Sequence, residues 1–175
     1  MKTWFLDQPK QMRMVDEPPT QLTGKLVKIK IEQQLLTNSL FDIYLGNSER
    51  EYPFVMARNA VGVVSEVPEG VSMLTKMDRV AIEPYIPCEN CDECRSGNHS
   101  DCSDIVELGQ NHDGLLKNFV DLPYTILHHI PDNLSNEKAL FVSYVSFCLN
   151  IVGISSSFIL LMFAIQAAKG TALSQ

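Results

Sequence analysis

Four cysteines within one short stretch constrain this chain more than any other feature of its sequence. Cys88, Cys91, Cys94 and Cys102 follow the spacing C-x2-C-x2-C-x7-C. Thiolates two residues apart can converge on one cation from a tight turn, and four sulfur atoms at about 2.3 Å complete the tetrahedral coordination of Zn²⁺. Because such a shell leaves no position for a substrate, the spacing predicts a structural zinc site that stabilises a loop poor in large apolar residues.

The sequence leaves other uses of these cysteines open. Disulfides are disfavoured in a reducing compartment, and the spacing departs from the C-x3-C-P end of the bacterial ferredoxin iron–sulfur pattern. His99 could replace one cysteine as a ligand, although a solvated loop histidine is the more frequent case. A nucleic-acid zinc finger is disfavoured by charge, because residues 83–121 hold nine acidic and two basic side chains.

Charge and the N-terminal sequence limit the class of function and the compartment. The 175 residues include 14 Lys and Arg against 21 Asp and Glu, a formal charge of −7 at pH 7. A protein that neutralises nucleic-acid phosphates is therefore not expected. The opening MKTWFLDQPK lacks the apolar core of a secretory signal, because Asp7 and Pro9 interrupt it. The expected location is the cytoplasm, which is reducing.

Short strand patterns separated by turn residues predict a β-rich domain over residues 1–134. In residues 26–32, Lys28 and the other charged side chains alternate with apolar ones, as in a half-buried strand. Three more segments have β-type character and lie between proline or glycine turns: 60–67, 79–82 and 124–127.

An apolar tail, residues 135–175, follows the β-rich domain. Ser135 can cap a helix, and residues 139–168 contain no charged side chain. Such a stretch needs burial, and we expect it to pack against the β-rich domain, a second copy of the chain or a partner subunit. A membrane helix is disfavoured because polar residues interrupt the stretch, and an aggregation-prone remnant of a lost domain is a third alternative.

A family resemblance rests on four stretches around the cysteine motif: AVGVVSEV, DRVAIEPYIPCENCDECRSGNHSDC, HDGLLKNFVDLP and IPDNLSNEKAL. Together they resemble the zinc-containing medium-chain alcohol dehydrogenases, especially the polyol and sugar-acid branch, over about residues 1–152. The resemblance implies a GroES-like β-barrel with its zinc lobe at residues 83–121. It also implies a dinucleotide-binding domain after the barrel, alcohol oxidation by hydride transfer to NAD or NADP, and a second zinc that polarises the alcohol oxygen.

The positions of that second, catalytic zinc carry other residues in this chain. Anchoring on Gly46 places Thr37 at the family's cysteine ligand and Leu40 at its aspartate. Arg58 and Asn59 fall on the family's histidine and glutamate, and Ser143 falls on the acid of its glutamate-proline pair. A guanidinium about 4 Å from Zn²⁺ would be repelled by roughly 8 kcal/mol at an effective dielectric constant near 20. The resemblance therefore implies a degenerate catalytic-zinc site.

Few other side chains are candidates for catalysis. Ser39 stands where the family has the hydroxyl that relays the alcohol proton, and Asp42 stands where some members have histidine. Both lie in NSLFD, which is typical of a turn between two strands, so Ser39 is a weak catalytic candidate. His128 and His129 are adjacent in a predicted strand and point to opposite faces, and His112 lies in a predicted turn.

A complete cofactor-binding unit is not expected in the tail. Residues 150–170 resemble the strand, turn and helix of a dinucleotide-binding fold, but its glycine positions fall on Gly153, Ser155 and Phe158. Gly153 is thus vestigial. Residues 149–175 are also fewer than the roughly 30 of one βαβ unit. NAD(P) is implied by the family only and is not expected to bind this chain.

These inferences predict a mainly β (α+β) protein: a GroES-like β-barrel with a four-cysteine zinc lobe, followed by apolar helices from a truncated Rossmann-type domain. Its structural zinc is retained, its catalytic zinc and cofactor sites are degenerate, and the isolated chain is expected to be inactive. One alternative is an active oxidoreductase whose cofactor domain comes from another chain, with Ser39 or Arg58 in a metal-free mechanism. Another is a module that oligomerises or attaches to membranes through its tail.

Overall fold

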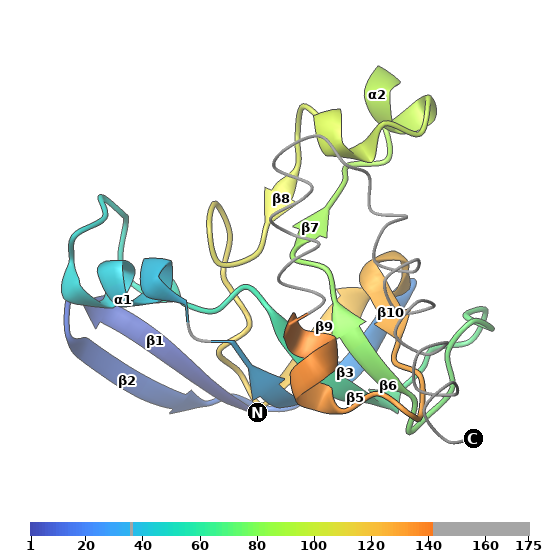
Figure 1. Ribbon diagram of the computed structural model, residues 1–175, viewed down its shortest axis with the longest axis horizontal. Helices are drawn as coiled ribbons and strands as arrows, with labels where there is room; N and C mark the ends of the chain where they lie inside the picture. The colour runs from blue at the N-terminus through green and yellow to red at the C-terminus, as the bar shows by residue number, and fades with distance from the viewer. Residues whose placement is uncertain (36, 142–175) are drawn as a thin grey trace, which may run out of the picture.

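Strands dominate the computed structural model of the chain, which describes residues 1–35 and 37–141 (Figure 1). The strands are β1 (Lys2–Gln8), β2 (Gln11–Asp16), β3 (Leu26–Gln34), β4 (Phe54–Val55), β5 (Ala60–Glu66), β6 (Arg79–Ile82), β7 (Tyr85–Ile86), β8 (Val106–Glu107), β9 (Phe119–Pro123) and β10 (Leu127–His129). The helices are α1 (Asn38–Leu45) and α2 (Asp92–Arg95), with 3-10 turns η1 (His99–Asp101) and η2 (Tyr124–Ile126). The predicted mainly β class is confirmed.

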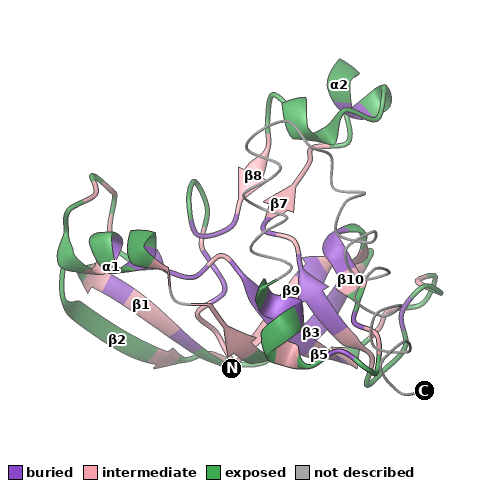
Figure 2. Cartoon of the chain, in the orientation of Figure 1, coloured by how far each residue is buried: buried purple, intermediate pink, exposed green. Residues whose placement is uncertain are grey.

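The described strands form three sheets, and the largest of them supplies most of the core. Its order is β10-β6-β5-β3-β9, and every neighbouring pair is antiparallel. Ile29 on β3, Val64 on β5 and Ile82 on β6 are completely buried. Figure 2 shows buried residues concentrated on these strands. The smaller sheets are β2-β1-β4 and β7-β8.

Strand β3 differs from its predicted pattern at one residue. Lys28 was expected to face solvent, but only 8% of it is exposed. Its Nζ donates to the backbone oxygen of Thr20 at 2.7 Å and lies 3.3 Å from the carboxylate of Glu66. Because β3 pairs on both sides here, with Glu66 of β5 and Asp121 of β9, neighbouring acidic residues can compensate the buried charge.

The segment expected to be a turn between strands, NSLFD, is helical. Leu40 and Ile43 are buried three residues apart on one face of α1, where they pack with Leu6 and Phe54. Gly46 ends the helix in the left-handed conformation, with φ of 83°. The turn prediction for Ser39 and Asp42 was therefore wrong, because the apolar spacing inside the motif favours a helix.

The predicted strand at residues 124–127 is also wrong for most of its length. Residues Tyr124–Ile126 form η2, and the strand begins only at Leu127. The consecutive side chains of Ile126 and Leu127 are both buried, which the alternation of a regular strand facing solvent on one side does not allow. The turn at η2 resolves this conflict.

A helix begins after Ser135, as predicted. Residues 136–141 are helical, the amide of Ala139 donates to the backbone oxygen of Ser135 at 3.0 Å, and the amide of Lys138 donates to its Oγ at 3.4 Å. Ala139 and Leu140 pack into the core. Residues 142–175, with Ser143 and Gly153, lie outside the described residues. No helix in the described part is long and apolar enough to cross a membrane.

Arg79 connects this helix to the sheet, and its removal is expected to destabilise the fold. Its guanidinium donates to the backbone oxygen of Leu134 at 2.7 Å and to the side chain of Asn136 at 2.6 and 3.1 Å. We expect Arg79→Met to lower the free energy of unfolding by about 2 kcal/mol in urea denaturation. The control Arg95→Met removes an exposed arginine 3.8 Å from Asp92 and should change it by less than about 0.5 kcal/mol. Equal losses in the two variants would contradict this role.

Candidate metal centre

Within the predicted zinc lobe at residues 83–121, β7 and β8 form a stem, and the cysteine motif lies beyond this stem in residues 88–104, which we call the lobe from here on. These two strands pair antiparallel at Tyr85 with Glu107 and Ile86 with Val106. Figure 1 shows α2 at the far end of this stem, away from the five-stranded sheet. Figure 2 shows that the lobe surface is mostly exposed. Within the lobe, the buried residues are Cys94 and Cys102, so the cysteines themselves form its interior.

The four thiols converge on one point. Their sulfur atoms all lie within 4.8 Å of one another, and those of Cys88 and Cys94 are 3.9 Å apart. Sulfur atoms at the corners of a tetrahedron around zinc are about 3.8 Å apart when each Zn–S bond is about 2.3 Å. The cluster is thus compatible with the structural zinc predicted from the spacing.

Backbone amides point at the sulfur atoms and favour their ionised form. The amide of Cys94 donates to the sulfur of Cys91 at 3.4 Å, the amide of Cys91 to that of Cys88 at 3.4 Å, and the amide of Cys88 to that of Cys102 at 3.3 Å. The amides of Cys94 and Ser103 lower the pKa of the Cys91 thiol to about 6. Burial raises the pKa of Cys94 to about 12, and a bound cation would offset that cost of ionisation.

The positions of the sulfur atoms argue against the alternatives to a zinc site. All four cysteines are free, and 3.9 Å is well beyond the disulfide bond length of about 2.05 Å. His99 is exposed, and the metal-compatible group found in the described part of the chain contains the four cysteines without it. The close approach of the sulfur atoms fits a single ion better than an iron–sulfur cluster, which places several atoms between its ligands.

Arg58, which the family resemblance aligns with a zinc-binding histidine, is held in an ion pair. Its Nη2 lies 2.9 Å from the carboxylate of Glu107, and its Nη1 donates to Gln110 at 3.1 Å. The side chain is only 16% exposed. A guanidinium stays protonated and has no lone pair to give a metal, so the residue at this position cannot act as a ligand.

The neighbouring positions are equally poor in metal donors. Thr37 is at the N-cap position of α1, where its side chain makes no capping hydrogen bond, and its hydroxyl lies 2.8 Å from that of the exposed Ser39. Leu40 is buried in the apolar cluster beneath α1. Asn59 is 3% exposed, and its amide nitrogen is buried without a hydrogen-bond partner among residues 1–35 and 37–141. Neutral hydroxyl and amide groups bind zinc far less well than the cysteine and carboxylate that the family uses.

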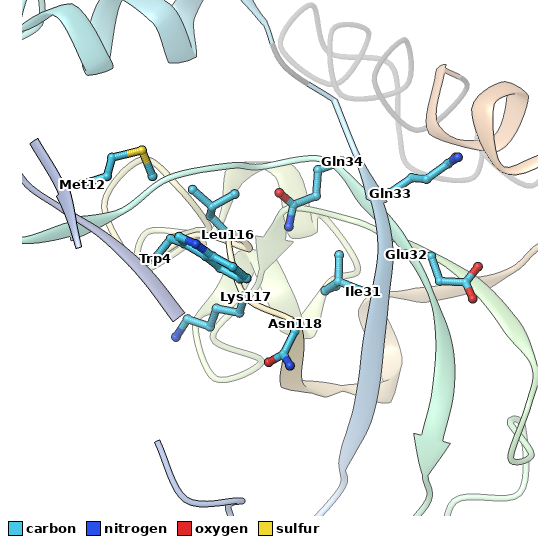
Figure 3. Close-up of a pocket in the computed structure, with 9 residues that line it drawn as sticks. All are labelled: Trp4, Met12, Ile31, Glu32, Gln33, Gln34, Leu116, Lys117 and Asn118. Atoms are coloured by element: carbon cyan, nitrogen blue, oxygen red, sulfur yellow. The ribbon is translucent and has the colours of Figure 1, made fainter. Parts of the chain in front are cut away.

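Two depressions meet at Leu116, and Leu40 lines the smaller of them. A cavity of about 200 Å³ has an apolar lining that includes Phe41, Ala57 and Leu116. A larger groove of about 380 Å³ opens between β1 and β3, with Leu116 again in its wall. In Figure 3, Trp4 and Lys117 lie on the β1 side of this groove, and the Gln34 amide reaches into it from β3. No motif in the sequence indicated either depression.

The other three histidines, His112, His128 and His129, lie outside the cysteine segment at residues 88–104. His128 of β10 is half-buried, with Nε2 2.9 Å from the carboxylate of Glu83, whereas His129 is exposed. This agrees with the opposite faces expected for adjacent strand residues. His112 is exposed in the segment between β8 and β9.

Comparison with known proteins gives one family match. The family described as alcohol dehydrogenase GroES-like domain matches residues 24–132. The chain is 28% identical over 155 residues to the starvation-sensing protein RspB of Escherichia coli, covering 87% of this chain and 45% of RspB. It is 26% identical over 147 residues to sorbitol dehydrogenase of Bacillus subtilis, covering 81% of this chain and 42% of that enzyme.

Solved structures share the fold. Galactitol-1-phosphate dehydrogenase from Escherichia coli superposes with a TM-score of 0.75 at 24% identity, over 83% of this chain and 42% of that one. The short chain alcohol dehydrogenase RspB from Escherichia coli CFT073, complexed with NADH, has a TM-score of 0.76 at 25% identity, over 87% and 45%. The chain spans less than half the length of these relatives.

Proposed function

The chain belongs to the alcohol dehydrogenase GroES-like domain family, and we propose that it is a catalytically silent member, with a structural zinc and no catalytic zinc. Among relatives named as dehydrogenases, this part of the chain accompanies alcohol and polyol oxidation. Here it would serve as a zinc-stabilised binding or association domain. Cys88, Cys91, Cys94 and Cys102 would hold the zinc.

The observation that carries this proposal is the ion pair between Arg58 and Glu107. At 2.9 Å and largely shielded from solvent, the pair fixes a permanent positive charge at the position of a metal-binding imidazole. Thr37 and Asn59 offer no thiolate or carboxylate to compensate a second positive charge. Ser143, at the remaining ligand position, has a side chain of the same neutral kind. The residues present do not fit a catalytic zinc.

A steady-state assay tests this proposal. We expect no NADH or NADPH formation when the purified zinc-loaded chain is mixed with sorbitol, xylitol or galactitol 1-phosphate and NAD⁺ or NADP⁺. The expected result follows because no group at Thr37, Arg58 or Asn59 can polarise an alcohol oxygen as zinc does. Turnover that disappears with a zinc chelator while the four-cysteine lobe stays folded would contradict it.

A second candidate function is an active oxidoreductase that uses a cofactor domain from another chain. The apolar cavity beside Ala57 supports it, because a cavity of about 200 Å³ could hold the carbon chain of a small alcohol. Calorimetric titration separates the two candidates. The silent-domain proposal expects no heat of binding with NADH or NADPH, whereas measurable affinity would favour the enzyme.

A further inference from the structure

Two arginine side chains converge on one neutral oxygen close to the stem of the zinc lobe. The Oε1 atom of Gln110 accepts hydrogen bonds from Nη2 of Arg50 at 3.4 Å and from Nη1 of Arg58 at 3.1 Å. Both are longer than the roughly 2.7–2.9 Å that separates a guanidinium nitrogen from an anionic oxygen. The exposed, uncharged side chain of Gln110 is thus weakly hydrogen-bonded at the point where the two guanidinium groups converge.

The position of Arg50 is fixed by packing, and some of its N–H groups are left without an acceptor among the described residues. Its Cζ lies 3.8 Å from the ring centroid of Phe54, so the ring supports the guanidinium. Its Nε and Nη1 are buried and have no hydrogen-bond partner within the part of the chain that the structure describes. Burial, with the nearby charge of Arg58, lowers the pKa of Arg50, while Tyr52 opposes the shift. The guanidinium is therefore incompletely compensated.

The positive charge of Arg50 is not neutralised by an ion pair. In the described part of the chain Glu107 pairs with Arg58, whereas no carboxylate oxygen lies within 4.0 Å of Arg50. Guanidinium groups match phosphate and carboxylate oxygens in their hydrogen-bond geometry. Since Gln110 is exposed on a loop, its side chain can give way to such a ligand without any change in the core.

We propose that Arg50 and Arg58 form a binding site for a small oxyanion, a phosphate or carboxylate group, which takes the place of the Gln110 Oε1 atom. The ligand would gain charge-assisted hydrogen bonds from both arginines and would supply a negative charge to pair with Arg50. This inference goes beyond the proposed function, since anion binding here does not depend on the zinc site.

Titration with inorganic phosphate tests the site directly. Binding is followed by calorimetry at constant ionic strength kept with sodium chloride, and sodium acetate is titrated in parallel to separate phosphate from carboxylate recognition. We expect saturable binding of at least one anion, weakened about tenfold or more in Arg50→Gln. The control Arg13→Gln, a surface arginine paired with Asp7, should bind as the parent does. Absence of saturable binding by both anions, or equal binding in Arg50→Gln, would overturn the proposal.

A second variant keeps the proposal testable if loss of an arginine disturbs folding. Gln110→Glu places a carboxylate where the ligand oxygen is expected, so it should raise the Tm and abolish phosphate and acetate binding. Gln21→Glu, an exposed change elsewhere, is the matched control for the added charge. A lower Tm in Gln110→Glu than in Gln21→Glu would overturn the proposal. Zinc content is measured separately, so failure here leaves the proposed function standing.

Discussion

Removing the metal is expected to unfold the lobe at residues 88–104 while the five-stranded sheet stays folded. The buried residues of this lobe are Cys94 and Cys102, so no apolar core remains once the ion is gone. Zinc binding at small structural sites is worth roughly 10–16 kcal/mol in peptides, far more than the short helix α2 can supply. Amide ¹H–¹⁵N spectra with and without a zinc chelator should show lost dispersion for the lobe and retained dispersion for β3, β5 and β6.

A substitution pair gives the matched control for that experiment. Cys102→Ser removes one ligand and should produce the chelator spectrum without any chelator. Ser103→Ala changes the exposed neighbouring side chain and should leave zinc content and spectrum as in the parent. A lobe that keeps its dispersed signals in Cys102→Ser at full metal depletion would show that something other than the ion holds it together.

Gly114→Ala is expected to have the second largest effect, because there is no room for a side chain at this position. A Cβ atom there would lie inside van der Waals distance of the backbone oxygens of Ala57 and Met56. Neither oxygen can move easily, since they accept the amides of Leu115 and Leu116 at 2.9 Å. We expect a loss of about 3 kcal/mol in the free energy of unfolding, measured in urea.

Gly70→Ala is the control for the backbone contribution to that loss. Gly70 has a φ of +91°, and no described atom lies within 4 Å of the position of a Cβ. Alanine there is therefore destabilised by backbone strain and not by a steric clash. That strain costs roughly 1–2 kcal/mol. A loss in Gly114→Ala no greater than in Gly70→Ala would contradict the close packing of residues 107–115 against residues 56–58.

Local patterns in the sequence predicted part of the fold, and tertiary contacts decided the rest. The alternation around Ile29 correctly predicted β3, and Ser135 correctly marked the start of a helix. Lys28 escaped prediction because its burial depends on Glu66, which is distant in sequence and adjacent only across the sheet. The three-residue spacing of Leu40 and Ile43 indicates a helix. The turn prediction was wrong because it relied on the turn-forming residues around them instead.

The cysteine cluster and the arginine pair also differ in how far the sequence predicts them. The cysteine cluster could be predicted because all its ligands lie within one short stretch, where spacing alone limits the geometry. The arginine pair could not, since Gln110 stands 60 residues from Arg50 and 52 from Arg58 in the sequence. The packing of the segment after β8 against residues 56–58 brings Gln110 to Arg58, and Arg50 donates to the same oxygen from a separate segment.

Elemental analysis of the purified chain tests the central claim most directly, because one closed sulfur site and one degenerate site predict a fixed zinc content. The expected result is one zinc per chain in the parent and in Arg58→Ala, and none in Cys94→Ser. Two zinc ions per chain, or one that survives in Cys94→Ser, would contradict this account, because the described residues offer no metal-compatible group besides the four cysteines.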